Sequence, residues 1–384
     1  MVKKDLVLQR TMNNLKLLQI WSDSTNINYL YAKYALLVPL LYAAPLLMVY
    51  DFVYRFKSGI PFDEELPPVF FSMINVTCMI VQFMANIESM NSIRLDLSNM
   101  EFTMPSDFAK TRDTANRHST FYGVSMYMFC ISYAAANIFG ENPCGNQIKG
   151  SDISCGIFLP SIMPFNINFF PVFQLIFLAQ FLSTVHLLVG GATVMFMLYE
   201  IVLYIGNRME HLCIILETIP NQRDEKVQKD TMKFCVQYHN FILSISKKTS
   251  RLFNKIFCFH IIFTGLVIAA LINQALENIN ARFHLFGWLI ALFLMCHSGQ
   301  QITYISENLG QRIMFMCKWY KLNTSLQKDL RFILLCSQEP LVFPAGPFAD
   351  LSYDLFIRII KTAYSYTALI ANTTDDTYDK KILQ

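Results

Sequence analysis

The run FQLIFLAQFLSTVHLLVGGATVMFMLY, residues 173–199, contains no Asp, Glu, Lys or Arg. About 20 apolar residues cross the roughly 30 Å of hydrocarbon in a bilayer. Unpaired backbone groups are not tolerated in lipid, so a run of this kind forms a membrane helix. Three prolines interrupt the preceding charge-free residues 153–172, which are expected to form a loop. We therefore predict a helix from Phe173 to about Gly206, longer than the bilayer requires.

Similar charge-free runs recur along the 384-residue chain, which is 54% hydrophobic and only 15% charged. Soluble domains carry about 25% charged residues. The expected spans are residues 34–54, 67–90, 121–140, 173–206, 256–275 and 285–309, followed by a last helix capped by Asp350 or Ser352. Pro39 and Pro45 are expected to kink the first span without ending it. The sequence thus predicts an all-α polytopic membrane protein with seven transmembrane helices.

Basic residues gather on one side of these spans. They precede the first span and follow the second, fourth and sixth, whereas the other side holds only Arg55, Lys57, Lys149, Arg282, Lys380 and Lys381. The positive-inside rule predicts a cytoplasmic N-terminus and, after seven crossings, an extracellular C-terminus, the reverse of a G-protein-coupled receptor. The expected segments are a cytoplasmic segment 1–33, six spans with cytoplasmic extensions 34–310, a cytoplasmic helical region 311–340, a re-entrant loop and seventh helix 341–374, and an extracellular tail 375–384.

Motifs for enzyme chemistry, a metal or a cofactor are not found, so neither an enzyme nor a cofactor is expected. The basic residues between spans four and five are explained by topology and anionic lipid, not by nucleic acid. His186 and His260 lie in spans and are expected to be hydrogen-bonded packing residues. Cys144 and Cys155 share an outer loop, where a disulfide is chemically permitted. The sequence leaves both a paired and an unpaired state open.

The stretch KTAYSYTALIAN, residues 361–372, carries a polar stripe on the last helix. Thr362, Ser365, Leu369 and Asn372 fall within about an 80° sector of an α-helix. Small polar residues of this kind occur at helix–helix interfaces. They also suit the wall of a pore, in which an apolar ring closes the path by dewetting. One helix cannot enclose a pore, so the second interpretation requires several subunits around an axis.

Three stretches extend this pattern back to Cys296: CHSGQQITYISENL, KWYKLNTSLQKDLRFILLCSQEPLVF and PAGPFADLSYDLFIRIIKTAYSYTALIAN. Their marks include Gly-x-x-Ile-Thr, Trp-Tyr before a Lys-Asp-Leu helix, Gln-x-Pro-Leu, Ala-Gly-x-Phe and Lys-Thr-x-Tyr-Ser-Tyr. Together they resemble the carboxyl-terminal signature of insect odorant receptors. Pro347 and Thr367 depart from the family's usual residues, which indicates local divergence.

The resemblance implies an odorant-gated, non-selective cation channel in the plasma membrane of olfactory sensory neurons. Such receptors form tetramers in which the last helix lines a central pore and the preceding cytoplasmic helices form an anchor. Leu369 then matches the hydrophobic gate and Asn372 the narrow polar constriction. This chain lacks the coreceptor's long loop between spans four and five, so it resembles an odorant-tuning subunit that pairs with a coreceptor. A gustatory-type channel and, less favoured, a G-protein-coupled receptor are the alternatives.

The resemblance also implies a pocket for a small volatile molecule in the outer half of the spans. The positions that it selects are Phe71, Ile74, Cys78, Cys130, Tyr133, Asn137, Phe177, Gln180, Phe181, Thr184, Trp288 and Ala291. Cys130, Tyr133 and Asn137 share one helix face. Tyr133, Asn137 and Gln180 are the expected hydrogen-bonding groups of a mostly apolar pocket. Ordinary helix packing remains the alternative role for each residue.

Overall fold

The computed structural model describes residues 7–22, 27–62, 66–99, 101–102, 104–105, 107–139, 153–154, 157–159, 161–163, 165, 167, 169–277, 279–347 and 349–382. Within its helices and strands, the side chains of residues 27–31, 34, 136–139, 153–154, 277, 280 and 368–382 lie outside the description.

The described chain is almost entirely helical. Its helices are α1 (Gln9–Leu17), α2 (Ile27–Leu41), α3 (Ala43–Ser58), α4 (Leu66–Ala85), α5 (Ile87–Leu97), α6 (Phe108–Phe139), α7 (Val172–Thr218), α8 (Glu225–Glu277), α9 (Ile279–Met316), α10 (Thr324–Cys336) and α11 (Tyr353–Ile382). Short 3-10 turns, η1 (Ile219–Asn221) and η2 (Trp319–Lys321), follow α7 and α9. Two short antiparallel strands, β1 (Ile153–Ser154) and β2 (Ser161–Ile162), lie in the loop before α7.

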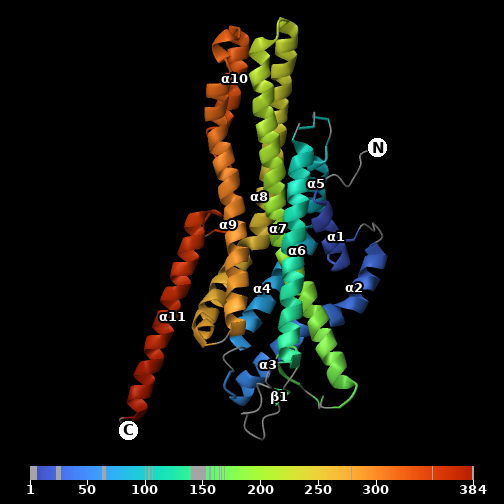
Figure 1. Ribbon diagram of the computed structural model, residues 1–384, viewed down its shortest axis with the longest axis vertical. Coiled ribbons are helices and arrows are strands. Elements are labelled where there is room, and N and C mark those ends of the chain that lie inside the picture. Colours follow the sequence, from blue (N-terminus) through green and yellow to red (C-terminus); the bar gives the residue numbers. More distant parts are fainter. Residues whose placement is uncertain are drawn as a thin grey trace.

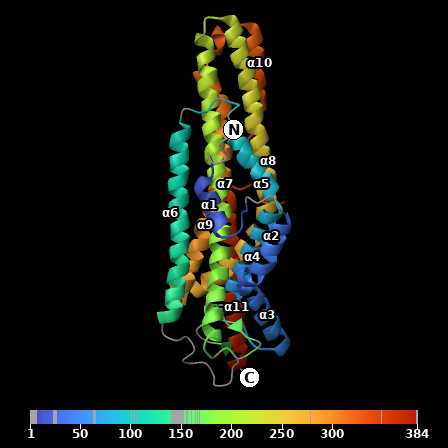
Figure 2. The ribbon, with the colours of Figure 1, turned by 90° about the vertical axis from the view of Figure 1, so that its right-hand side faces the viewer.

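Helices α7, α8 and α9 form the long axis of the molecule. They contain 47, 53 and 38 residues. At about 1.5 Å per residue, α7 alone is about 70 Å long, more than twice the thickness of the hydrocarbon layer. Their ends project together beyond the rest of the bundle, with α10 packed beside them (Figure 1 and Figure 2). The prediction that the fourth helix is longer than a bilayer requires is therefore confirmed.

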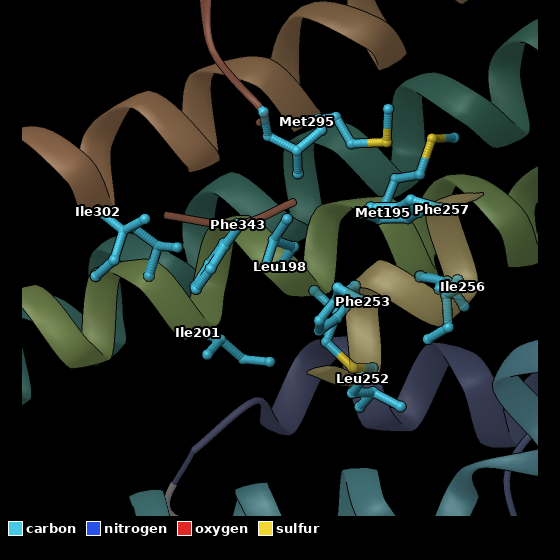
Figure 3. Close-up of a cluster of buried hydrophobic side chains, with 14 of the residues drawn as sticks. Met195, Leu198, Ile201, Leu252, Phe253, Ile256, Phe257, Met295, Ile302 and Phe343 are labelled. Carbon is cyan, nitrogen blue, oxygen red and sulfur yellow. The ribbon is translucent and has the colours of Figure 1, made fainter. Parts of the chain in front are cut away.

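The centre of the bundle is an apolar core shared by these three helices and one loop. Figure 3 shows side chains from α7, α8 and α9 facing one another around Phe343 of the loop before α11. The labelled members are Met195, Leu198, Ile201, Leu252, Phe253, Ile256, Phe257, Met295, Ile302 and Phe343, all buried. Burial of Phe343 in this core holds the loop against the membrane helices.

Within the part of the chain that the structure describes, four helices are long and apolar enough to cross a membrane. They are α4, α7 together with η1, and most of α8 and of α9; a fifth is added if the bent pair α2–α3 counts as one span. The molecule is thus an all-helical, multi-span membrane protein. The predicted third and seventh spans coincide with parts of α6 and α11, which are not among these helices, so a total of seven stays a prediction.

The first predicted span is two helices, not one kinked helix. Helices α2 and α3 meet at 59° on either side of Tyr42. Pro45 has no N–H to donate to Leu41, which favours a break at this point. The hydroxyl of Ser183 on α7 bridges the break in place of the missing backbone hydrogen bond. It donates to the Leu41 carbonyl (2.8 Å) and accepts from the Ala44 N–H (3.1 Å).

The segment before the first span, predicted only as a polar cytoplasmic stretch, contains helix α1, which buries one face. Its Leu15 is fully buried, and Thr11 donates a hydrogen bond to the buried Glu200 of α7. Ile20, just beyond α1, packs where a Cβ on Gly190 would overlap its Cδ1. The lack of a side chain at Gly190 in the long apolar run of α7 therefore leaves room for the N-terminal segment to pack between the membrane helices.

The loop between α10 and α11 is tied to α9 by backbone contacts. Thr303 donates to the Leu341 carbonyl (3.0 Å), and the Ser306 hydroxyl accepts from the Leu341 N–H (2.9 Å). A Cβ on Gly299 would overlap the carbonyl oxygen of Leu351, so only glycine allows this approach. Ser352 accepts from the N–H of Leu355 (3.2 Å), which makes it the helix cap that the sequence predicted.

Candidate functional site

A cavity of about 230 Å³ lies among α4, α6, α7, α8 and α9. Its lining residues are Val76, Tyr122, Ser125, Met126, Phe129, Leu188, Ala192, Met195, His260, Phe283, His284, Phe286, Gly287, Trp288, Ile290 and Ala291. Phe283 and Phe286 are 60% and 62% exposed, so the cavity reaches the surface of the chain beside them. This size and apolar character suit a small organic molecule.

One polar group in the cavity wall is built around His284. The indole Nε1 of Trp288 donates to its Nε2 at 3.0 Å, one helical turn away on α9. The hydroxyl of Ser72 on α4 lies 3.3 Å from the same nitrogen. Because Ser72 is buried and Trp288 nearly so, these bonds fix the imidazole ring against the wall.

A second polar group surrounds His260 on α8. Its Nδ1 lies 2.9 Å from Oδ1 of Asn75, and the Asn75 amide donates to Oγ1 of Thr264 at 3.3 Å. The His260 ring stacks on Trp288 with 5.8 Å between ring centroids. His186 is hydrogen-bonded to the Leu18 carbonyl at 2.7 Å. Both histidines are therefore hydrogen-bonded packing residues as expected, although His260 also lines the cavity.

Of the predicted pocket residues, Trp288 and Ala291 line this cavity. Tyr133, Phe177 and Phe181 gather instead around Phe158, with ring centroids 5.3, 5.8 and 5.6 Å from it. Phe158 comes from the loop before α7 and is 1% exposed. The structure thus brings three predicted residues together, but a loop side chain occupies the space between them.

Gln180 is engaged by the same loop. Its Oε1 accepts from the Leu159 N–H at 3.1 Å, and its Nε2 lies 3.3 Å from Oγ of Ser161 and 3.4 Å from the Leu159 carbonyl. The side chain is fully buried. Its amide therefore fastens the loop onto α7 in this structure, and contact with a ligand stays a prediction.

The other predicted pocket residues whose side chains are described do not line the cavity. Phe71 packs against Phe70 and Phe263, Ile74 and Cys78 are half-buried on α4, and Cys130 is buried on α6. Thr184 is buried, and among the described residues its hydroxyl has no hydrogen-bond partner. The side chain of Asn137 lies outside the described residues.

Sequence reasoning missed the cavity residues on α6 and α7. Tyr122, Met126 and Phe129 are spaced i, i+4, i+7 and so share one face, which lies earlier in α6 than the predicted Cys130 and Tyr133. On α7 the lining begins at Leu188, after all four predicted residues. Helical spacing showed which residues share one face of a helix. The local sequence did not show how far along the helix the cavity lies.

On α11, Thr362 and Ser365 are exposed, and their hydroxyls donate to the carbonyls of Arg358 and Lys361 at 2.8 and 2.9 Å. Ala363 and Thr367 are buried, and Thr367 donates to the Ala269 carbonyl of α8 at 3.0 Å. Leu369 and Asn372 belong to the same helix, but their side chains lie outside the description, as do Cys144 and Cys155. The described residues contain no cluster that could hold a metal ion.

Comparisons with known proteins agree with this geometry. The sequence matches the family described as 7tm odorant receptor over residues 65–364. Odorant receptor 13a of Drosophila melanogaster is 26% identical over 171 residues, 40% of this chain and 41% of that protein. Odorant receptor 82a of the same species is 26% identical over 224 residues, 55% of this chain and 56% of that protein. The chain thus matches about half the length of these curated relatives.

The insect olfactory receptor OR5 from Machilis hrabei, solved in complex with eugenol, superposes with a TM-score of 0.77. It is 11% identical, and the match covers 95% of this chain and 97% of that one. The shared fold extends over nearly the whole molecule, and the family is one of receptors, as predicted, not of enzymes. The chain therefore belongs to the insect 7tm odorant receptor family.

Proposed function

We propose that this chain is the odorant-binding subunit of an odorant-gated, non-selective cation channel. It works with coreceptor subunits in a heterotetramer, in the plasma membrane of olfactory sensory neurons, with no nucleic-acid partner. The predicted segment boundaries at residues 33, 310, 340 and 374 belong to this proposal. Its ligand is a small volatile molecule, a class to which the eugenol bound by the Machilis receptor also belongs.

The observation that carries the proposal is the uncovered polar face of α11. Helices α8 and α9 contact α11, and its buried residues Ala363 and Thr367 face them. Thr362 and Ser365 lie on another face, which no described element covers. The C-terminal end of α11 stands clear of the bundle (Figure 1). A polar face that is not packed within its own chain suits contact with water in a pore shared by several subunits.

The expected gate is Leu369, which helical geometry puts on the same face as Thr362 and Ser365. A ring containing this side chain offers no oxygen to replace the water around a cation, so desolvation is the barrier to conduction. Asn372 lies about one turn further along, where its amide can stand in for a hydration oxygen. The two residues should therefore control different properties, leak and ion selectivity.

Whole-cell recording from cells that express this chain with a coreceptor tests the proposal. Leu369→Ser should raise the current without odorant, because it removes bulk and supplies a hydroxyl. The leak should be partial, since coreceptor subunits keep their own gate residues. Asn372→Ala should change the relative permeability to cations. Ile360→Ser is the matched control, since it lies on the opposite side of α11 by helical geometry, and it should add no leak.

Surface labelling must show normal amounts of each variant. Unchanged basal current in Leu369→Ser together with unchanged permeability in Asn372→Ala would show that this face of α11 meets lipid or protein. A leak in Ile360→Ser equal to that of Leu369→Ser would argue against a specific pore face.

A further inference from the structure

We propose that the cavity selects small aromatic molecules with one hydrogen-bond-accepting oxygen, such as a carbonyl, and that His284 donates the hydrogen bond to that oxygen. This inference rests on the proposed function of the chain as an odorant-binding subunit, and it takes the cavity as the odorant site. To that function it adds the chemical class of the ligand and the residue that recognises the ligand oxygen.

The tautomer of His284 follows from its partner. An indole N–H can only donate a hydrogen bond, so Nε2 of His284, 3.0 Å from the Trp288 Nε1, must be the acceptor. A neutral imidazole has one N–H, and that proton therefore sits on Nδ1. The buried hydroxyl of Ser72 lies 3.3 Å from the same Nε2 atom. Ser72 therefore does not engage Nδ1, which lies on the other side of the imidazole ring.

The Nδ1–H group of His284 is available to a ligand. Among the described residues it has no hydrogen-bond partner, and His284 lines the cavity. No Asp, Glu, Lys or Arg is among the described lining residues, so no charged side chain competes for this donor. A neutral ligand oxygen would satisfy it, whereas a ligand that covers this half-buried side chain without offering an acceptor would leave the donor unsatisfied, which is costly. The wall thus favours a ligand with an acceptor over one without.

Other polar groups in the wall are engaged or are less well fixed. Nδ1 of His260 pairs with Asn75, and the Ser125 hydroxyl donates to the Phe121 carbonyl at 2.8 Å. The phenol of Tyr122 is the alternative donor, on a ring that stacks on Phe196 with 5.1 Å between centroids. Tyr122 therefore provides a matched control for His284.

The remaining wall sets the size and shape of the ligand. The cavity volume of about 230 Å³ lies below the roughly 300 Å³ at which pockets for drug-sized ligands begin, so the cavity suits a smaller molecule. Phe129, Phe283, Trp288 and the thioethers of Met126 and Met195 line it. Aromatic rings pack edge-to-face or offset on such side chains, and methionine sulfur contacts ring edges. One aromatic ring with a short substituent satisfies both limits.

Acetophenone and α-methylstyrene test the proposal, because they share one shape and differ in a carbonyl oxygen against a methylene group. Binding of each probe is measured from the ligand-dependent rise in the unfolding temperature of the purified receptor–coreceptor complex. The expected dissociation constant for acetophenone is about five- to ten-fold lower in the unmodified protein, as one hydrogen bond gives. His284→Phe should reduce this ratio to within about two-fold, whereas Tyr122→Phe should retain it.

Equal binding of the two probes by the unmodified protein would overturn the proposal, and that comparison needs no variant to fold. Failure of both probes to bind, or a ratio retained in His284→Phe, would also overturn it. Odorant-evoked currents recorded in parallel separate the two proposals. A binding preference without any current would leave the ligand chemistry standing and remove the channel function, while currents without a preference would do the reverse.

Discussion

At the scale of single residues, Phe158 decides how much room the outer part of the bundle offers. Its ring makes edge contacts with Tyr133, Phe177 and Phe181, and it is almost fully buried. Gln180 fastens the neighbouring Leu159 through both its amide atoms. Three of the predicted pocket residues, Tyr133, Phe177 and Phe181, therefore form a socket for a loop side chain.

Phe158→Ala should extend the odorant response to larger molecules, because removal of the ring frees space among the predicted pocket residues Tyr133, Phe177 and Phe181. In a series of aryl ketones of increasing chain length, the preferred length should rise. Each methylene that the variant newly buries should lower the half-maximal concentration by about four-fold, from about 0.8 kcal/mol per buried CH₂. Concentration–response curves with the coreceptor measure this.

The control for this substitution is Phe165→Ala, in the same loop but 55% exposed, which should leave the preferred length unchanged. If Phe158→Ala reaches the cell surface and its chain-length preference equals that of the unmodified receptor, the socket does not communicate with the ligand site.

At the scale of elements, α9 connects the cavity to α11. Its first turns carry His284, Trp288 and Ala291 in the cavity wall. Further along, Gly299 allows the backbone of Leu351 to pack directly on α9, and the Gln300 side chain accepts from the Tyr353 N–H at 3.4 Å. A shift of α9 on ligand binding would thus reach the start of α11 through rigid packing contacts.

Gly299→Ala should disrupt this junction, since the added methyl group overlaps the Leu351 carbonyl. Overpacking of this kind costs about 1–3 kcal/mol, so the unfolding temperature and the surface amount should both fall. Gly265→Ala on α8 is the control, because its new Cβ would lie 3.9 Å from Ile359, an ordinary contact. Thermal unfolding of the purified complex measures both variants. Equal stability of the two would mean that α11 can move away from α9 without cost.

At the scale of the whole molecule, the ends of α7, α8 and α9 and the helix α10 form a layer beyond the membrane helices (Figure 2). Lys248 of α8 pairs with Asp96 at 2.6 Å, and Arg312 of α9 pairs with Glu210 of α7. Many of the basic residues that predict the cytoplasmic side lie on these helices and their connections, at positions 208–255 and 312–331. The C-terminus lies at the opposite end of the molecule (Figure 1).

An epitope placed after Gln384 should be labelled on intact cells, and one placed before Met1 only after permeabilisation. The physical reason is the excess of Lys and Arg in the loops on the N-terminal side. Antibody labelling of cells before and after detergent treatment measures this. Labelling of the N-terminal epitope on intact cells would reverse the orientation and exclude α11 as a helix that emerges outside the cell.

Much of the fold was predictable from local sequence. The charge-free run of α7 and the cap of α11, for which Asp350 and Ser352 were the two candidates, both depend on residues close together in the chain. The signature from Cys296 to Asn372 likewise gave the family, which the match over residues 65–364 confirms. Hydrophobic length and charge composition suffice here because lipid imposes one rule on every span.

The tertiary structure alone decided the rest, because each remaining feature depends on contacts distant in sequence. Ser183 stabilises the break at Tyr42 from another helix, and Gly190 makes room for Ile20. Phe158 fills the predicted pocket from a loop that carried no signal for this role. Trp288 was predicted to contact the ligand, but only the folded chain brings the Ser72 hydroxyl of α4 to within 3.3 Å of its partner His284. The composition of the chain determines where the membrane spans lie, whereas a binding site depends on which side chains the fold brings into contact.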